Sequence, residues 1–274
     1  MFRVEKVQLI PDTPILGGVV LETPKHGHGI FRTDTGECLG VVGDGYTIVQ
    51  NEELYEVTRK AAEAAGLDQD QIEFRALQDG RKVAFQVQLP DWSLAGDTVR
   101  RYASCISSHD GSSSLGIGLT GIKVFCTNTW LQAMRSVGRA RHTVSITDKI
   151  VSMREAMIET IEQDKYLFEV YREMSKQPFT EVEIDPFIKA LTGIDVKEVL
   201  DWEEGRKRSR NLNIAEDMRE AILIEFKDTG KTKWGAFNGV TRYTNHMVER
   251  SDQLDYLYFK TGRKLSDKAF KILT

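Results

Sequence analysis

The sequence predicts an α+β protein: a mainly antiparallel sheet with a packed helix, followed by a helical C-terminal region. Three observations favour this class. Residues 1–50 are rich in Gly, Thr, Pro and β-branched residues and poor in helix formers. Two hairpin patterns follow, in which apolar and polar residues alternate. From residue 147 onward, apolar residues recur with the 3.6-residue period of helices. Strands followed by helices are typical of the α+β class.

The N-terminal segment is expected to form short strands and turns. Runs typical of strands occur at Val4–Leu9, Gly18–Leu21 and Leu39–Val42. Clusters of Pro, Gly and Asp indicate turns at Pro24–Gly29 and Asp34–Gly36.

A helix is expected next, because its start, its apolar face and its stop can all be read from the sequence. Asn51 is the predicted N-cap. Leu54, Val57 and Ala61 share one helical face, and Gly66 ends the pattern.

Two hairpins are predicted after this helix. Ile72–Leu77 and Lys82–Leu89 both alternate, and Asp79-Gly80 between them is a hairpin turn. Asp97–Ser107 and Gly116–Cys126 form a second pair around a polar Gly/Ser-rich turn.

The remainder of the chain is expected to be mainly helical. One long helix is predicted over 147–176, and a short terminal helix is predicted near 253–259. Between them, shorter helices are expected within 179–226, separated by Pro178, Pro186, Gly193 and Gly205. The predicted domains are a sheet core over 1–146 and a mainly helical region over 147–274 that packs on it.

A G-x-G-x-x-G pattern at Gly116, Gly118 and Gly121 invites a dinucleotide-binding interpretation. That site requires a helix directly after the glycines, whose N-terminus meets the pyrophosphate. The residues that follow, Ile122–Cys126, are typical of a strand instead. The glycines are therefore expected to serve a hairpin turn or a bulge, and no nucleotide cofactor is predicted.

Composition narrows the class of protein further. The 274 residues are 41% hydrophobic and 28% charged, as in ordinary globular proteins. No apolar run is long enough for a transmembrane helix, and the N-terminus lacks the apolar core of a signal peptide. Three widely spaced cysteines favour a reduced compartment. A cytoplasmic protein without membrane contact is expected.

No catalytic or metal site is predicted. Ser107 to Asp110 contains Ser, His and Asp, but neighbours in one turn cannot form a catalytic relay, so His109 and Asp110 are expected to shape the turn. Cys126 has no histidine tied to it and is interpreted as a buried structural thiol. The five histidines show no spacing that is diagnostic of a metal site.

Basic residues gather in the middle of an otherwise acidic chain. The whole chain has a net charge of −4, yet residues 97–149 hold seven basic and three acidic residues, a net charge of +4. Residues 150–204 hold six basic and fourteen acidic residues, a net charge of −8. Proteins that bind single-stranded nucleic acid use cations to hold the phosphates and aromatic rings to stack on the bases. The candidate nucleic-acid-binding residues are Arg100, Arg101, Lys123, Asn128, Trp130, Arg135, Arg139, Arg141 and His142.

Several short segments, in order along the chain, resemble a family found on phages and plasmids and known as domain of unknown function 932. They are Tyr46–Asn51, Asp79–Val83, Ser108–Ser112, Val124–Thr129, Arg141–Thr143 and Trp234–Tyr243. The resemblance implies an origin in mobile elements and no established chemistry. The order of helix and antiparallel sheet is also similar to single-strand annealing proteins of the Rad-fifty-two type, which implies homo-oligomeric rings with an outer basic groove.

Three functions follow as hypotheses. The first is a nucleic-acid-binding protein of phage or plasmid origin that binds single-stranded DNA and anneals it in recombination or replication. The second is a counter-defence or host-interaction protein that binds a protein partner through its acidic 150–204 face, without DNA. The third is an enzyme acting on nucleotides or nucleic acid, for which the sequence offers no metal set and no nucleophile–base pair.

Overall fold

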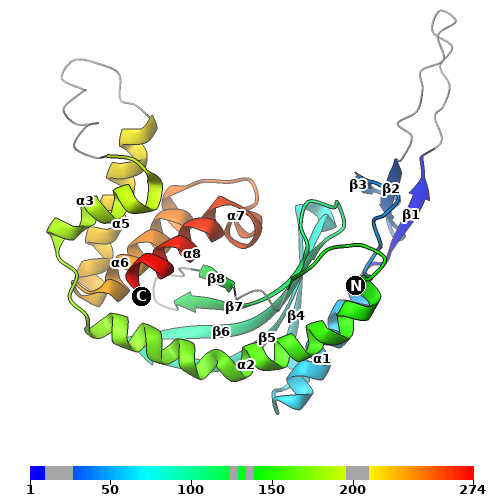
Figure 1. The fold of residues 1–274 in the computed structure, drawn as a ribbon, viewed down its shortest axis with the longest axis horizontal. Helices are drawn as coiled ribbons and strands as arrows, with labels where there is room; N and C mark the ends of the chain where they lie inside the picture. The colour runs from blue at the N-terminus through cyan, green and yellow to red at the C-terminus, as the bar shows by residue number, and fades with distance from the viewer. Residues whose placement is uncertain (10–26, 124–128, 134–138, 196–209) are drawn as a thin grey trace, which may run out of the picture. The chain divides into compact units, whose positions relative to one another are not determined.

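A computed structural model describes residues 1–9, 27–123, 129–133, 139–195 and 210–274 of the chain (Figure 1). It confirms the α+β class, because two antiparallel sheets are followed by C-terminal helices. Every helix among these residues is too short or too polar to cross a membrane.

The first sheet is built from the N-terminal segment and has the strand order β1-β2-β3. Its strands are β1 (Val4–Gln8), β2 (His28–Arg32) and β3 (Cys38–Val42). β1 and β3 confirm two predicted strands, and the predicted strand at 18–21 lies outside the described residues. β2 was not predicted, and it contains Gly29, which the prediction assigned to a turn.

Helix α1 (Asn51–Ala64) is confirmed, but Asn51 is not its N-cap. Gln50 takes that position, and its backbone N–H donates to Oε2 of Glu53 at 2.7 Å in a capping box. The Asn51 side chain instead points into the interior, where Nδ2 donates to the carbonyl of Phe2 at 2.8 Å. Gly66, with φ +69°, follows the C-cap as predicted.

The second sheet has six strands in the order β4-β5-β6-β7-β8, with β9 pairing with β7. The strands are β4 (Ile72–Leu77), β5 (Lys82–Leu94), β6 (Asp97–Ser108), β7 (Leu115–Lys123), β8 (Thr129–Ala133) and β9 (Arg139–Ala140). The first predicted hairpin is confirmed, with Ile72 opposite Val87. β5 runs past the predicted end at Leu89, because apolar residues resume at Trp92 and Leu94 and are buried there.

β7 runs straight through Gly116, Gly118 and Gly121. The glycine pattern therefore lies within a strand and is not followed by a helix. The glycines therefore lack the helix N-terminus that a dinucleotide site of this type requires, and they form part of a strand rather than the predicted hairpin turn.

The C-terminal part is helical. Its elements are α2 (Ile146–Lys176), α3 (Glu181–Thr192), α5 (Arg210–Thr229), α6 (Lys233–Arg242), a π-helical turn (Tyr243–Met247), α7 (Gln253–Phe259) and α8 (Thr261–Leu273). The predicted long helix and the helix at 253–259 are confirmed. Pro186 was expected to separate helices but lies inside α3, whereas Gly193 ends α3 with φ +80° as expected.

The described chain forms two compact units. Unit 1 comprises residues 1–88, 103–118 and 134–160, and unit 2 comprises residues 89–102, 119–133 and 161–274. The chain passes between them within β5, β6, β7 and α2. The division predicted after residue 146 stays a prediction; α2 begins at Ile146, and its residues up to 160 belong to unit 1.

Unit 1 buries one face of α1 against strands. Leu54, Val57 and Ala61 of α1 are buried, as the helical pattern predicts. Phe85 of β5 is fully buried between Phe74 and Tyr55, with ring centroids 5.0 and 6.3 Å away. Burial of such apolar rings supplies most of the stabilisation of a sheet with a packed helix.

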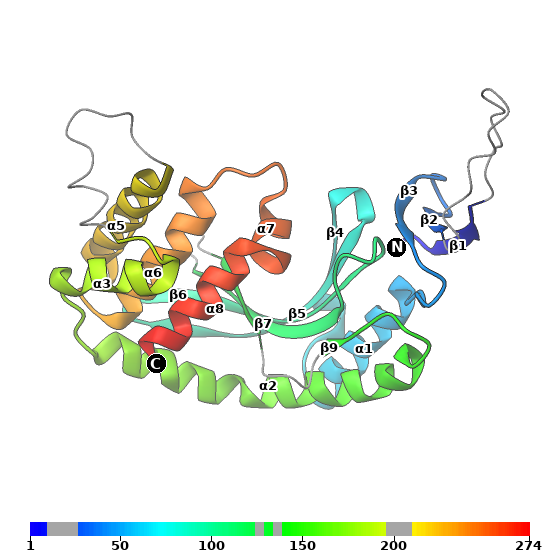
Figure 2. The same ribbon diagram turned by 45° about the horizontal axis from the view of Figure 1, so that its top comes forward.

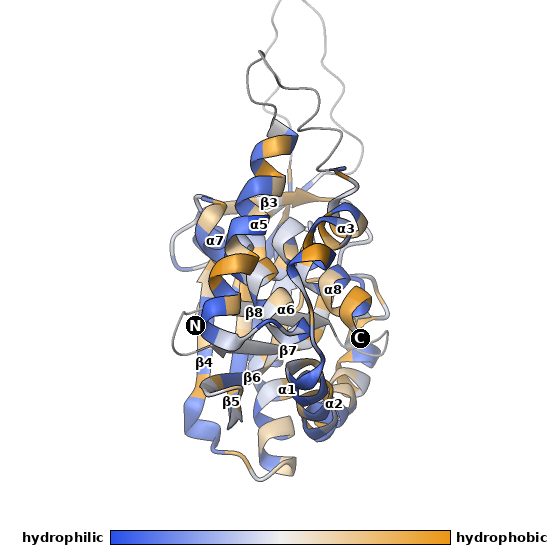
Figure 3. Ribbon diagram, turned by 90° about the vertical axis from the view of Figure 1, so that its left-hand side faces the viewer, coloured by the Kyte–Doolittle hydropathy of each residue, from blue (hydrophilic) through white to orange (hydrophobic). Residues whose placement is uncertain are grey.

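Unit 2 has an aromatic core. Tyr171 of α2 lies 5.1 Å from Trp234 and 5.4 Å from Phe237 of α6, measured between ring centroids. α6 packs against both α5 and α8, and the three helices lie side by side in Figure 2. Figure 3 shows hydrophobic and hydrophilic residues alternating along α5, as expected for a helix with one buried face.

Candidate functional site

The residues predicted to bind nucleic acid fall into distinct structural groups. Arg100 on β6 and Arg141 after β9 are exposed, whereas Arg101 and His142 are buried. Three further candidates lie on strands for which the backbone, but not the side chain, is described: Lys123, Trp130 and Arg139. Asn128 and Arg135 lie outside the described residues.

Strand topology brings three of these candidates to one end of the second sheet. β6 and β7 are neighbours joined by a short loop, and β8 is the next strand after β7, so successive strands run antiparallel. Arg100 stands near the start of β6, Lys123 ends β7, and Trp130 is the second residue of β8. All three therefore lie at the same end of adjacent strands. β9 pairs with the first residues of β7 instead, where Gly116 stands opposite Arg139.

Arg101 is not available to a ligand in this arrangement. Its Nη1 donates to Oδ2 of Asp164 on α2 at 2.7 Å, and its guanidinium lies 3.2 Å from the centroid of the Trp92 ring. The side chain is 1% exposed, and this burial lowers the pKa of Arg101 to about 9. Because successive side chains of a strand face opposite sides, a buried Arg101 agrees with an exposed Arg100.

His142 belongs to a buried polar cluster in unit 1. Its ring stacks on that of Tyr46, with centroids 4.8 Å apart. Its Nδ1 lies 3.1 Å from the carbonyl oxygen of Thr47, and its Nε2 lies 3.1 Å from Oγ of Ser107. A carbonyl can only accept, so Nδ1 carries the proton and Nε2 accepts from the Ser107 hydroxyl. Burial lowers the pKa of His142, which keeps the ring neutral.

His109 lies in the same cluster and is fixed in the opposite tautomer. Asn51 donates through Nδ2 to Phe2, so its Oδ1 accepts from Nε2–H of His109 at 3.0 Å. Nδ1 of His109 is buried without a hydrogen-bond partner among the described residues. Burial is the main cause that lowers the pKa of His109 to about 4, and His142 nearby adds to the effect. We call Tyr46, Asn51, Ser107, His109 and His142 the histidine network.

The loop between β6 and β7 is held against the histidine network. The Tyr46 hydroxyl donates to the carbonyl of Ser108 at 2.8 Å, and the His109 amide donates to the carbonyl of Arg81 at 2.7 Å. Asp110 accepts from the backbone of Ser112 at 2.9 Å, in agreement with the turn-shaping role predicted for it. A Cβ atom at Gly40 of β3 would lie 2.8 Å from Cα of Asp110. The close contact between β3 and this loop therefore requires glycine at position 40.

The histidine network contains a hydroxyl and a histidine placed like a nucleophile and its base, but both are buried away from solvent. Ser107 beside the unprotonated Nε2 of His142 is the geometry that activates a hydroxyl. The third partner, however, is a backbone carbonyl in place of a carboxylate. Ser107 and His109 are both fully buried, and the pocket described below does not touch them. The network is therefore suited to order the loop rather than to attack a substrate.

The described part of the chain places two of the three cysteines. Cys105 is fully buried, which raises the pKa of its thiol to about 12 and leaves it unreactive. Cys38 is exposed and free. Among the described residues, no three His, Cys, Asp or Glu side chains are grouped as metal ligands. Cys126 lies outside the described residues.

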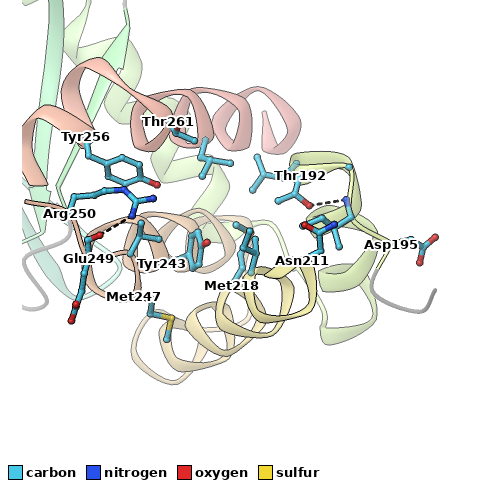
Figure 4. A pocket seen from close by; sticks show the side chains of 16 residues that line it. Thr192, Asp195, Asn211, Met218, Tyr243, Met247, Glu249, Arg250, Tyr256 and Thr261 are labelled. Atoms are coloured by element: carbon cyan, nitrogen blue, oxygen red, sulfur yellow. Dashed lines mark hydrogen bonds between the residues drawn. The ribbon is translucent and has the colours of Figure 1, made fainter. Parts of the chain in front are cut away.

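Unit 2 contains an open pocket of about 840 Å³. Figure 4 shows it between α8 and α7 on one side and α5 with the π-helical turn on the other. Its apolar lining includes Leu191, Met218 and Leu265. Pockets of this size, with a few placed polar groups, are typical of small-molecule sites.

The two ends of this pocket differ in chemistry. Arg250, Tyr256 and Thr261 lie toward one end, and Thr192 and Asn211 lie toward the other (Figure 4). The Arg250 guanidinium is 5.2 Å from the centroid of the Tyr256 ring. Burial raises the pKa of the Tyr256 phenol, so this side chain remains neutral.

A family model described as domain of unknown function (DUF932) matches residues 38–267. The chain belongs to this family. The match includes most of the histidine network's unit and the whole pocket of unit 2. No curated protein and no solved structure matches the chain. The similarity to Rad-fifty-two-type annealing proteins therefore gains no support from these comparisons.

The longest segment that carries the DUF932 resemblance, Trp234–Tyr243, is explained by helix packing. Trp234 and Phe237 are fully buried. A side chain at Gly239 would lie 2.4 Å from Cγ1 of Ile222, so glycine allows α6 to approach α5 closely. Arg242 pairs with the buried Glu225 at 3.1 Å. The two aromatic residues thus belong to the core of this DUF932 chain, and Arg242 is held by its ion pair with a buried carboxylate.

Sequence reasoning missed the pocket because its polar residues are far apart in the chain. Asn211, Arg250, Tyr256 and Thr261 come from separate elements and have no spacing in common. Helix α8, which carries Thr261 and Leu265 of the lining, was also not predicted. α8 starts after Lys260, which provides no side-chain cap, so the usual start signal is lacking. The apolar spacing of Leu265, Ala269 and Leu273 was the signal available for it.

Proposed function

We propose that this DUF932 chain binds single-stranded nucleic acid, with single-stranded DNA as its ligand. The proposed surface, called the strand-end surface, is formed by Arg100, Lys123 and Trp130. The observation that supports it is the topology of β6, β7 and β8, whose shared end carries these residues. Two cations can hold phosphates there, and one indole can stack on a base.

The surroundings of Arg100 support this assignment. Arg100 is exposed while the adjacent Arg101 is anchored to Asp164 and Trp92. The anchored residue fixes the strand beneath the exposed one, so Arg100 projects from an ordered backbone. A cation on a rigid strand loses less conformational entropy on binding than one on a loop.

Arg100 and Lys123 of the strand-end surface belong to the basic stretch of the sequence. Residues 97–149 carry a net charge of +4 in a chain whose total is −4. A local excess of cations attracts a polyanion even when the whole protein is acidic. Arg139 and Arg141 belong to the same basic stretch but to β9 and the residues after it, so we do not include them in the strand-end surface.

The test is the salt dependence of binding to a fluorescently labelled oligothymidine, measured by anisotropy. Replacing Arg100 and Lys123 by Ala should weaken binding and reduce the slope of log K against log salt by about 1.4, since each phosphate contact contributes about 0.7. Trp130→Ala should weaken binding by about fivefold or more, from the loss of stacking.

The matched control removes two other cations from unit 2. Arg172 and Lys176 of α2 are exposed and pair with glutamates of the same helix, and Arg172→Ala with Lys176→Ala lowers the net charge by the same amount. This control should retain the wild-type slope. Equal loss in both double variants would show a general charge effect and contradict the strand-end surface, as would absence of binding by the wild type at low salt.

A further inference from the structure

Arg250, at the pocket of unit 2, is a cation with no compensating carboxylate in the described part of the chain. It is exposed, its Nη1 donates to the backbone carbonyl of Glu249 at 2.9 Å, and its guanidinium rests near the Tyr256 ring. Among the described residues, no acidic side chain lies within ion-pair distance of it. Figure 4 shows the Glu249 carboxylate directed away from the Arg250 guanidinium. The remaining N–H groups of Arg250 are free to bind an anion in a bidentate way.

Thr261 adds a hydroxyl at the same end of the pocket. It is exposed and is the first residue of α8. No side chain caps this helix, so the first-turn N–H groups near Thr261 add positive potential to that of Arg250. The other acidic residue of the lining, Asp195, is paired with Lys189. The Arg250 end therefore favours an anionic group.

The middle and far end of the pocket have a different character. Met218 is fully buried and Leu191 and Tyr243 nearly so, and together they offer an apolar surface. Asn211 at the far end is exposed, and its amide presents both a donor and an acceptor. A ligand that matches these features has an anion at one end, a body of low polarity, and a hydrogen-bonding edge at the other.

We propose that this pocket binds a nucleoside monophosphate, with its phosphate at Arg250 and its base directed toward Asn211. The phosphate provides the anion, and the ribose and the faces of the base provide the body. The base edge provides the donors and acceptors that an amide recognises. The volume of about 840 Å³ is within the range of small-molecule pockets. The pocket lining includes none of the three residues of the strand-end surface, so this proposal does not rest on the proposed function.

The experiment is calorimetric titration of the full chain with adenosine, guanosine, cytidine and uridine monophosphates. At least one should bind, and Arg250→Ala should weaken that binding about tenfold or more, because a charge-assisted bidentate contact is lost. Thr261→Trp, a change at an exposed position, should also weaken binding by obstructing the pocket. Arg172→Ala, which removes an exposed arginine elsewhere in unit 2, should bind as the wild type does.

Two further ligands separate phosphate recognition from nucleotide recognition. The matching nucleoside should bind more weakly than its monophosphate, and inorganic phosphate should bind more weakly than either. Inorganic phosphate that binds as tightly as every nucleotide would overturn the proposal, as would nucleotide binding that Arg250→Ala and Thr261→Trp leave unchanged. Absence of heat and of thermal stabilisation with all four nucleotides would also overturn it.

The same variants distinguish this proposal from the proposed strand binding. Arg250→Ala should retain the wild-type affinity for labelled oligothymidine, and the double variant of Arg100 and Lys123 should retain nucleotide binding. Loss of oligothymidine binding in Arg250→Ala would contradict the separation of the two sites.

Discussion

The histidine network of unit 1 and the pocket of unit 2 use polar side chains in opposite ways. In the network, Ser107 and both histidines are bonded inside the protein, and Nδ1 of His109 is the one ring nitrogen of the pair without a described partner. In the pocket, Arg250 and Asn211 face solvent, and no described carboxylate balances Arg250. The network can hold a loop in place, while the pocket can exchange a ligand with water.

This difference shows what the DUF932 segments of this chain encode. Three of them, Tyr46–Asn51, Ser108–Ser112 and Arg141–Thr143, meet in or beside the sealed network. Of the residues in the segments that carry the DUF932 resemblance, Tyr243 alone is in the described lining of the pocket. The polar residues of these three segments therefore hold the fold together. The exposed polar groups that a ligand could reach, such as Arg250 and Asn211, lie outside these segments.

The largest effect on stability is expected from breaking the histidine network at Asn51. Asn51→Leu would leave Nε2–H of His109 and the carbonyl of Phe2 buried without partners. Each such group costs about 1–3 kcal/mol, so the free energy of unfolding should fall by about 2–6 kcal/mol. Denaturant unfolding followed by circular dichroism would measure the change.

The control for this substitution is Glu63→Leu, on the same helix α1 but exposed. It should change the free energy of unfolding by less than about 0.5 kcal/mol. Similar losses in the two variants would mean that Asn51 is no more important than a surface residue and that the network is not sealed.

The second effect is a dependence of stability on pH. The pKa of His109 is lowered to about 4 in the folded chain, against 6.5 for an ordinary histidine, and that of His142 is lowered in the same direction. The unfolded chain therefore binds the proton more readily, and the stability contributed by neutral His109 is present above about pH 6.5. It should be lost as pH falls from 6.5 toward 4, by on the order of 3 kcal/mol.

Urea unfolding at several pH values in this range would measure the loss. His109→Gln should be less stable at neutral pH but should show a shallower slope between pH 6.5 and 4. Replacement of the exposed His246 by Gln is the matched control and should keep the wild-type slope. A wild-type stability that does not change over this range would contradict the burial of neutral His109.

The smallest effect is expected at the open pocket. Arg250→Ala removes an exposed side chain whose contacts are one backbone carbonyl and one ring. The free energy of unfolding should change by less than about 0.5 kcal/mol, because surface substitutions away from caps and buried pairs rarely cost more. A loss of 2 kcal/mol or more by the same denaturant assay would mean that Arg250 is part of the fold and would remove the contrast with the histidine network.

Most of the fold could be predicted because its signals are local. Alternation predicted the hairpin of β4 and β5, and helical periodicity predicted α1 and α2. The errors arose where tertiary contacts override local signals. Asn51 has a good N-cap side chain, but that side chain is bonded to Phe2, and Gln50 caps α1 in its place.

The candidate sites were predictable to a smaller degree. The sequence contains no signal that distinguishes Arg100 from Arg101. Arg101 is the buried one because it pairs with Asp164, which is far away in the chain. His142 stands in a basic stretch, yet the Tyr46 ring and the carbonyl of Thr47 enclose it. The residues of the pocket converge only after several helices have packed, so no spacing in the sequence indicates them.

The central claim, that the exposed Arg100 binds single-stranded DNA while the buried Arg101 holds the fold, is tested most directly by arginine footprinting. The intact chain is labelled with a dicarbonyl reagent, with and without saturating oligothymidine, and each arginine is quantified by mass spectrometry. The account predicts that Arg100 reacts in the free chain and is protected by the oligonucleotide, that Arg101 is unreactive throughout, and that Arg250 stays reactive. Arg100 labelling that saturating oligonucleotide leaves unchanged would contradict it.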